Sequence, residues 1–116
     1  MDSEIIIYHN ARCSKSRGAL EILQERNLRH TVRWYLKEPL SREEWSSLLR
    51  KLQIRPLELI RKNEAFFKEN LQGKELSDEQ WMEILMEHPE LMERPIVEKG
   101  DRAIIARPPE KLEEIL

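Results

Sequence analysis

The chain has 116 residues, a length that predicts one domain with a buried core and no need of disulfides. Charged residues make up 36% of the sequence, yet the formal net charge is only −2, so the composition indicates neither a nucleic-acid-binding protein nor an acidic tail. No apolar run approaches the roughly 20 residues that span a bilayer, and the start, MDSEIIIYHN, lacks the features of a secretory signal. With a single cysteine, these features predict a cytoplasmic protein that binds no membrane.

The first part of the chain predicts a strand, a helix and a second strand. EIIIY at 4–8 is a short β-branched apolar run, which is typical of a buried strand. Apolar residues at helical spacing then predict a helix that begins near Cys13 or Ser14 and ends near Asn27. HTVRWYL at 30–36 alternates apolar and more polar residues and predicts the second strand. Its apolar members are Val32, Trp34 and Leu36.

The middle of the chain, roughly residues 41–90, predicts a helical insert. SREE at 41–44 and SDEQ at 77–80 each match a capping box, in which a serine and an acidic or amide residue three positions later cap a helix. Pro56 is well placed in the first turn of another helix.

The last part predicts a hairpin and a terminal helix. In RPIVEKGDRAIIARPP at 94–109, one strand is followed by a turn at 99–101 and a second strand through Ile105. PPEKLEEIL at 108–116 then predicts a helix. The order predicts an α/β, thioredoxin-like fold with β-α-β and β-β-α halves and a helical insert, in a single domain over 1–116.

The only cysteine lies in YHNARCSKSR, where the first strand gives way to the first helix. A cysteine at a helix N-terminus meets unpaired N–H groups and the positive end of the helix dipole, which favour a thiolate and attract an oxyanion. His9 lowers the pKa of Cys13 further if it is protonated or hydrogen-bonded. Basic and hydroxyl residues surround the thiol: Arg12, Ser14, Lys15, Ser16 and Arg17. A buried, unreactive cysteine is the alternative, but these flanks favour a nucleophile.

Three other cysteine sites do not fit the sequence. A C-x-x-C redox motif needs a second cysteine where Asn10 or Ser16 stands, and a tyrosine-phosphatase-like loop needs arginine in place of Ala19. A structural zinc site is not expected, because the histidines are dispersed and one cysteine cannot complete it.

YHNARCSKSR resembles the active-site loop of the glutaredoxin-linked arsenate reductases, the ArsC family, with its pattern H-x3-C-x3-R. LIRKN at 59–63, MERPIV at 92–97 and ARPPE at 106–110 look like three further family blocks in the family's order. The resemblance covers essentially the whole chain and is greatest to a short bacterial subgroup. Ala11 stands where many members have proline, and Leu116 follows soon after the last block, before the longer tail of the best-known members.

The resemblance implies a role for each matching residue. The nucleophile and the three arginines that bind the oxyanion would be Cys13, Arg61, Arg94 and Arg107. The residues that support them would be His9, which tunes the thiol, Ser16 and Arg17, which support the loop, and Pro95, a cis proline. Guanidinium forks suit arsenate oxygens. Two simpler alternatives stay open: Arg61 pairs with Glu58 or Glu64 along its helix, and His9 only binds backbone.

The implied activity is reduction of arsenate to arsenite, or reduction of a similar oxyanion, without a bound cofactor. Because the chain has one cysteine, an external thiol must complete the reaction; the family uses glutathione as co-substrate and then glutaredoxin. One alternative is a reductase of another thiol-linked or glutathionylated substrate. Another is a non-enzymatic, Spx-like regulator that binds RNA polymerase, although the C-x-x-C switch of those proteins is missing between Asn10 and Cys13.

Overall fold

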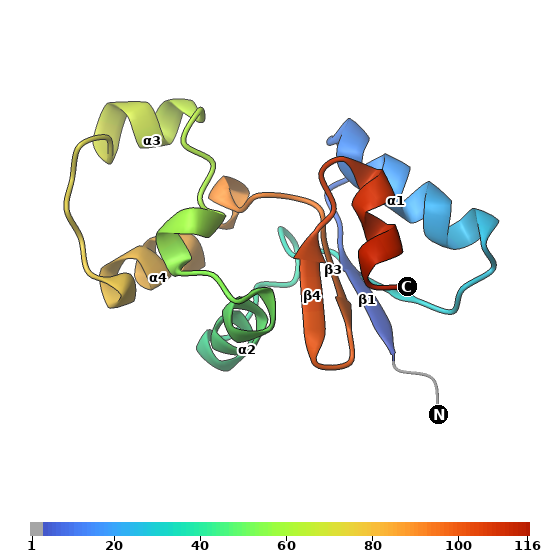
Figure 1. Ribbon diagram of the computed structural model, residues 1–116. Helices are drawn as coiled ribbons and strands as arrows, with labels where there is room; N and C mark the ends of the chain where they lie inside the picture. Colours follow the sequence, from blue (N-terminus) through green and yellow to red (C-terminus); the bar gives the residue numbers. More distant parts are fainter. Residues whose placement is uncertain (1–3) are drawn as a thin grey trace. The chain divides into compact units, whose positions relative to one another are not determined.

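The computed structural model describes residues 4–116, so the acidic start of the chain at residues 1–3 lies outside the described residues. The chain divides into two compact units (Figure 1). The sheet unit comprises the residues up to Glu38 together with Arg94–Leu116, and the helical unit comprises Pro39–Glu93. The helical unit corresponds to the predicted insert, and the assignment of all 116 residues to a single domain stays a prediction.

The sheet unit confirms the predicted β-α-β and β-β-α order. Its elements are β1 (Ile5–Tyr8), α1 (Ser14–Glu25), β2 (Thr31–Arg33), β3 (Ile96–Lys99), β4 (Arg102–Ile105) and the 3-10 helix η3 (Pro109–Glu114). The sheet order is β2-β1-β3-β4, with β1 parallel to β2 and the other pairs antiparallel. The terminal helix predicted at 108–116 is therefore a shorter 3-10 helix.

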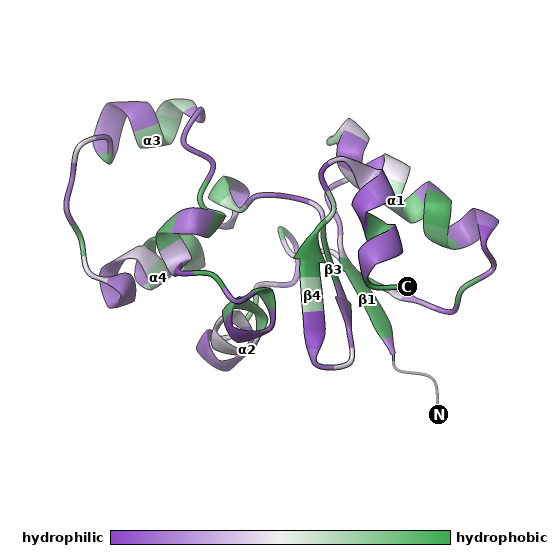
Figure 2. Ribbon diagram, viewed as in Figure 1, coloured by the Kyte–Doolittle hydropathy of each residue, from purple (hydrophilic) through white to green (hydrophobic). Residues whose placement is uncertain are grey.

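Alternate residues of the strands form the core of the sheet unit. Ile5 and Ile7 of β1 and Val97 of β3 are buried in a cluster with residues of α1 and η3. The other members come from α1, from η3 and from the residues on either side of η3: Ala19, Leu23, Ala106, Leu112 and Ile115. Figure 1 shows α1 beside the red C-terminal segment, and Figure 2 shows the hydrophobic colouring of the strands. Burying each large apolar side chain stabilises the fold by about 1.5–3 kcal/mol.

The strand register brings several loops to one end of the sheet. Tyr8 of β1 lies opposite Ile96 of β3 and beside Arg33 of β2. Ile96 in turn lies opposite Ile105 of β4. The carboxyl ends of β1, β2 and β4 therefore meet the start of β3. Ligands of open α/β sheets bind at the carboxyl ends of strands, so we refer to this region as the thiol end of the sheet, since Cys13 follows β1 there.

The second strand is shorter than predicted, and the predicted alternation beyond it is wrong. β2 ends at Arg33, and the N–H groups of residues 37 and 38 both donate to the carbonyl oxygen of Trp34 in a turn. Tyr35 is fully buried, whereas Trp34 and Leu36 are 40% and 45% exposed. Among residues 4–116, β2 is an edge strand that pairs with β1, and β1 ends opposite Arg33. Beyond Arg33 the strand pairing with β1 ends, and the chain turns at Trp34.

The helical unit contains α2 (Arg42–Leu52), η1 (Pro56–Leu59), α3 (Ala65–Asn70), α4 (Asp78–Glu87) and η2 (Pro89–Leu91). Both predicted capping boxes are confirmed: Ser41 caps α2 with Glu44, and Ser77 caps α4 with Gln80. The helix predicted at Pro56 is only a 3-10 turn, and α3 was not predicted separately.

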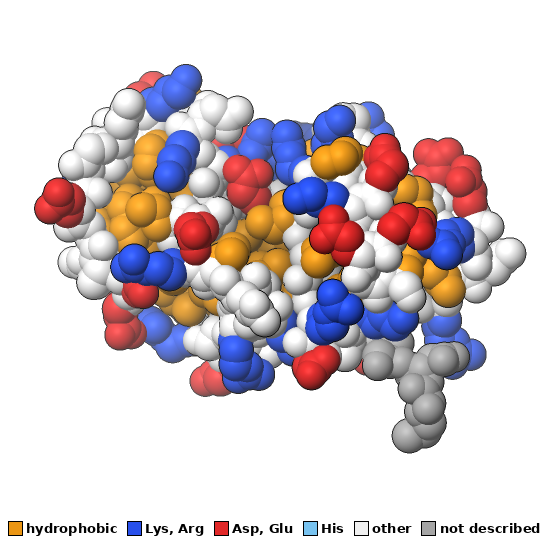
Figure 3. Space-filling view, viewed as in Figure 1, with side chains coloured by type: hydrophobic (Ala, Val, Ile, Leu, Met, Phe, Trp, Pro, Cys, Tyr) orange, Lys and Arg blue, Asp and Glu red, His pale blue; other side chains and the backbone are white. Residues whose placement is uncertain are grey.

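The helices of the described part of the chain are short, and the charges on the surface are mixed. Within residues 4–116, no helix has the length and hydrophobicity needed to cross a membrane. On the face drawn in Figure 3, acidic and basic side chains are interspersed. This mixing agrees with a net charge close to zero.

Candidate active site

Asn10 shapes the loop that carries the thiol. Its carbonyl oxygen accepts the N–H of Cys13 at 3.0 Å, and its side-chain oxygen accepts the N–H of Arg12 at 3.0 Å. The N–H of Asn10 itself donates to Ser16 Oγ at 3.0 Å. Asparagine commonly folds turns in this way. The turn delivers Cys13 to the N-cap of α1, where its carbonyl oxygen accepts the N–H of Arg17 at 3.0 Å.

The environment of Cys13 favours a thiolate. The residue is only 9% exposed, and burial raises the pKa of its thiol. The pKa is nevertheless lowered overall, because four other contributions outweigh burial. These are the N–H of Ser16, a hydrogen bond from the side chain of Arg94, the N–H of Lys15 and the charge of Arg94. A lowered pKa at a helix N-terminus is typical of reactive cysteines. The predicted anion-stabilising position is thus present, and Arg94 is the side chain whose charge lowers this pKa.

His9 and Ser16 form a buried pair beneath the loop. His9 Nδ1 and Ser16 Oγ are 2.6 Å apart, and the two residues are 3% and 0% exposed. Burial, and then the positive charge of Arg17, lowers the pKa of His9. The imidazole is therefore neutral near pH 7 and does not bring a positive charge to the thiol. Its ring binds a side-chain hydroxyl rather than backbone only, and its predicted effect on Cys13 would act through Ser16.

Arg17 holds the loop against the helix. Its Nη1 donates to the carbonyl oxygen of Ala11 at 2.8 Å. This bond connects the first turns of α1 to the residue two positions before Cys13. The geometry fits the loop-supporting role that the family resemblance implies for Arg17, and that role stays a prediction.

Arg94 and Arg107 reach the thiol end of the sheet on paired segments. The N–H of Ala106 donates to the carbonyl oxygen of Pro95 at 2.8 Å, which continues the pairing of β3 with β4 by one step. The peptide bonds from Arg94 to Pro95 and from Arg107 to Pro108 are both cis, which for Pro95 agrees with the family resemblance. Arg94 Nε is buried and has no hydrogen-bond partner among residues 4–116. Such a donor is available to an oxyanion.

The segment after Arg107 packs on α1 close to the thiol. A Cβ atom added to Gly18 would lie 3.0 Å from Cγ of Pro109, so the absence of a side chain at Gly18 permits this close approach. Gly18 is in the second turn of the helix that Cys13 caps. Arg107, which is partly buried, thus follows a strand that ends at the thiol end and precedes a proline that contacts α1. Its contact with an oxyanion stays a prediction.

Arg61 belongs to the helical unit. Its N–H donates to the carbonyl oxygen of Leu91 at 2.7 Å, next to the bridge between Ile60 and Met92. Its Nη1 lies 2.6 Å from Oε1 of Glu64. One of the two ion pairs left open by the sequence is therefore present, and the meeting of Arg61 with Cys13 stays a prediction.

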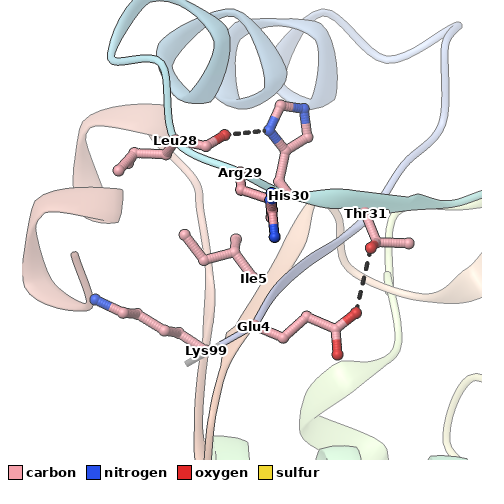
Figure 4. Close-up of a pocket in the computed structure, with 7 residues that line it drawn as sticks. All are labelled: Glu4, Ile5, Leu28, Arg29, His30, Thr31 and Lys99. Carbon is pink, nitrogen blue, oxygen red and sulfur yellow. Dashed lines mark hydrogen bonds between the residues drawn. The ribbon is translucent and has the colours of Figure 1, made fainter. Parts of the chain in front are cut away.

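A separate cavity of about 600 Å³ contains none of the predicted site residues. Its lining comes from the start of β1, the approach to β2 and the end of β3, which form the sheet end opposite the thiol end (Figure 4). Polar groups there bind one another: His30 Nδ1 lies 2.7 Å from the carbonyl oxygen of Leu28, and Thr31 Oγ1 donates to Glu4 Oε1 at 3.2 Å. This cavity is distinct from the Cys13 site.

The four-stranded mixed sheet carries a cysteine at the N-cap of its first helix and a cis proline directly before β3. These features define a thioredoxin-like fold. Residues 8–115 match the ArsC family. The chain belongs to this family.

Known proteins support this assignment over the full length. A Haemophilus influenzae protein named arsenate reductase is 40% identical over 114 residues, which cover 97% of this chain and 98% of that one. An Escherichia coli protein of the same name is 36% identical, over 98% of this chain and 82% of its own length. The solved structure of an arsenate reductase from Vibrio cholerae superposes with a TM-score of 0.92 at 38% identity, over 100% of both chains.

Proposed function

We propose that this protein reduces arsenate to arsenite, with the Cys13 thiolate as nucleophile and with glutathione and glutaredoxin as external reductants. The observation that carries the proposal is the Cys13 thiol, whose pKa is lowered despite burial by backbone N–H groups and by Arg94. Relatives of matching length that are named arsenate reductase support the choice of substrate.

Arginines would bind and polarise the oxyanion. Arg94 donates a hydrogen bond to the thiol and retains a buried Nε without a partner in the described part of the chain. Arg107, from the neighbouring strand end, and Arg61 would complete the set. Guanidinium groups present paired donors that match tetrahedral oxyanions, and they would neutralise the charge that otherwise repels a thiolate from an arsenate dianion.

The proposed reaction begins with attack of the Cys13 thiolate on arsenic, with loss of one arsenate oxygen as water after proton transfer. A glutathione thiolate then attacks the Cys13 sulfur of this adduct, so that an S–S bond forms while the S–As bond breaks and leaves its electron pair on arsenic. The two thiols together supply the two electrons, so arsenic leaves as arsenite and Cys13 remains in a mixed disulfide with glutathione. A glutaredoxin thiolate attacks the glutathione sulfur and releases the Cys13 thiolate. The external thiols are required because the chain has a single cysteine.

The test is arsenate-dependent oxidation of NADPH in the presence of glutathione, glutaredoxin and glutathione reductase. We expect turnover by the wild-type protein and none by Cys13→Ser. Arg94→Gln, Arg107→Gln and Arg61→Gln should each lose activity, whereas Arg102→Gln, which changes an exposed arginine at the other end of β4, should retain it.

Absence of turnover with a Cys13 thiol that still reacts readily with iodoacetamide would contradict arsenate as substrate. The next substrates to test would then be glutathionylated proteins and small mixed disulfides, which need the same thiolate but no oxyanion site. An unreactive thiol would contradict the enzymatic role itself.

A further inference from the structure

Trp34 is an exposed aromatic residue in direct contact with the buried His9. The indole is 40% exposed, and it follows β2 at the thiol end of the sheet. Its ring centroid lies 5.0 Å from that of the His9 imidazole, with the rings inclined at 71° in a T-shaped contact. The N–H of His9 also donates to the carbonyl oxygen of Arg33 at 2.9 Å. His9 is therefore held by β2 through its backbone and by Trp34 through its ring.

A short series of contacts leads from Trp34 to the thiol. The His9 ring, through Nδ1, also lies 2.6 Å from Ser16 Oγ. Ser16 lies in the first turn of α1, and its hydroxyl also accepts the N–H of Asn10 at 3.0 Å. The backbone N–H of the same Ser16 is directed at the Cys13 thiol. A fixed His9 ring thus fixes the residue whose N–H stabilises the thiolate.

We propose that Trp34 is a positioning residue for the nucleophile: its indole holds the imidazole of His9 in the orientation that binds the Ser16 hydroxyl, and so fixes the first turn of α1 beneath Cys13. The inference rests on the proposed role of Cys13 as nucleophile. T-shaped aromatic pairs prefer defined geometries and stabilise them beyond simple burial, so the contact adds a second restraint on a ring that also binds Ser16 Oγ. Lys37, whose Nζ lies 5.9 Å from the Trp34 ring, is the nearby charged group on the indole side, and Arg17 is the one whose charge reaches His9.

The test measures the rate at which iodoacetamide alkylates Cys13 as a function of pH, in the wild-type protein and in five variants. Trp34→Leu removes the aromatic ring, and Trp34→Phe keeps one. Leu36→Ala is the matched control, because Leu36 lies on the same turn and is 45% exposed. Ser16→Ala, alone and with Trp34→Leu, asks whether the effect passes through Ser16. No arsenate is used, so a failure here is distinct from a failure of the proposed activity.

We expect Trp34→Leu to lower the thiolate population below the midpoint of the pH profile by about two- to tenfold, the range that corresponds to the strength of one aromatic pair, and to move the midpoint upward. Because a thiolate of higher pKa is more nucleophilic, alkylation should slow by only about 1.5- to 4-fold. Trp34→Phe should restore most of the rate, and Leu36→Ala should match wild type. In the Ser16→Ala background, Trp34→Leu should have no further effect. Equal profiles for Trp34→Leu and wild type, equal losses in the leucine and phenylalanine variants, or a full loss that persists without the Ser16 hydroxyl would each overturn the proposal.

A second measurement needs no variant and is independent of folding defects. Nitrogen-15 shifts of the His9 ring in the wild-type protein report its tautomer. One predominant tautomer near neutral pH is expected, because a fixed contact with Ser16 Oγ favours the proton on one ring nitrogen. Averaged ring-nitrogen shifts would show that neither tautomer is favoured, and would overturn the proposal that His9 is held in one hydrogen-bonded orientation.

Discussion

Arg94→Gln isolates the contribution of one guanidinium to the ionisation of Cys13. Burial raises the pKa of the thiol, and Arg94 acts against burial both by a hydrogen bond and by its charge. Hydrogen bonds to charged groups contribute about 1.5–3 kcal/mol, and a tenfold change in population corresponds to about 1.4 kcal/mol. We therefore expect the thiolate population of the variant, at a pH below both pKa values, to fall by about 10- to 100-fold.

The measured rate should fall less than the population. A thiolate of higher pKa is intrinsically more nucleophilic, with a Brønsted coefficient of about 0.4–0.5, which recovers nearly half of the loss on a logarithmic scale. Alkylation by iodoacetamide should consequently slow by roughly 3- to 10-fold below the midpoint. The midpoint of the pH profile follows the thiolate population itself, so it should move upward by about 1–2 pH units.

The assay is alkylation of Cys13 followed by mass spectrometry at a series of pH values. Arg102→Gln is the control, because Arg102 lies at the opposite end of the sheet and its Nη2 donates to the carbonyl oxygen of Glu114 at 3.2 Å. Arg94→Lys, which keeps the charge but loses the fork, should lie between wild type and Arg94→Gln. The reasoning is refuted if Arg94→Gln folds normally and its midpoint equals that of wild type.

Two further predictions concern stability. Gly18→Val should lower the free energy of unfolding, measured in urea, by about 1–3 kcal/mol more than Gln24→Val on the exposed side of the same helix, because the new side chain would overlap Pro109; equal losses would show that the contact yields freely. The folded-state pKa of His9 is lowered, by burial first, so the unfolded chain binds more protons and stability should fall as the pH drops through the ordinary value of 6.5. His9→Asn should lack this fall in the free energy of unfolding between about pH 7.5 and pH 5.5, whereas His30→Asn should keep it. An equal fall in His9→Asn and in the wild-type protein would contradict the attribution to His9.

Local signals in the sequence were sufficient for most elements. A β-branched run predicted β1, and the two capping boxes predicted the starts of α2 and α4, because each of these depends on residues a few positions apart. The position of Cys13 at the N-cap of α1 also followed from a strand, a short loop and a helix in succession.

Features that depend on strand partners were not predictable in this way. The alternation through Trp34 and Leu36 continued a strand pattern, but the length of β2 is set by where β1 ends. The contact of Trp34 with His9 follows from that early turn, so nothing in the local sequence indicated it. Likewise, several cations surround Cys13 in the sequence, but the register of β3 against β1 decides that Arg94 is the one that reaches the thiol.

The hairpin between β3 and β4 places an exposed turn at the end of the sheet that lies farthest from Cys13. Its turn, at Gly100 and Asp101, is exposed and lies at the sheet end opposite Cys13. Exposed turns tolerate insertions well, while the four paired positions on each strand hold the far end in register. A fluorescent or affinity tag inserted after Gly100 should therefore leave the Cys13 site intact. If the tag contains no cysteine, Cys13 stays the single target of any cysteine-directed probe.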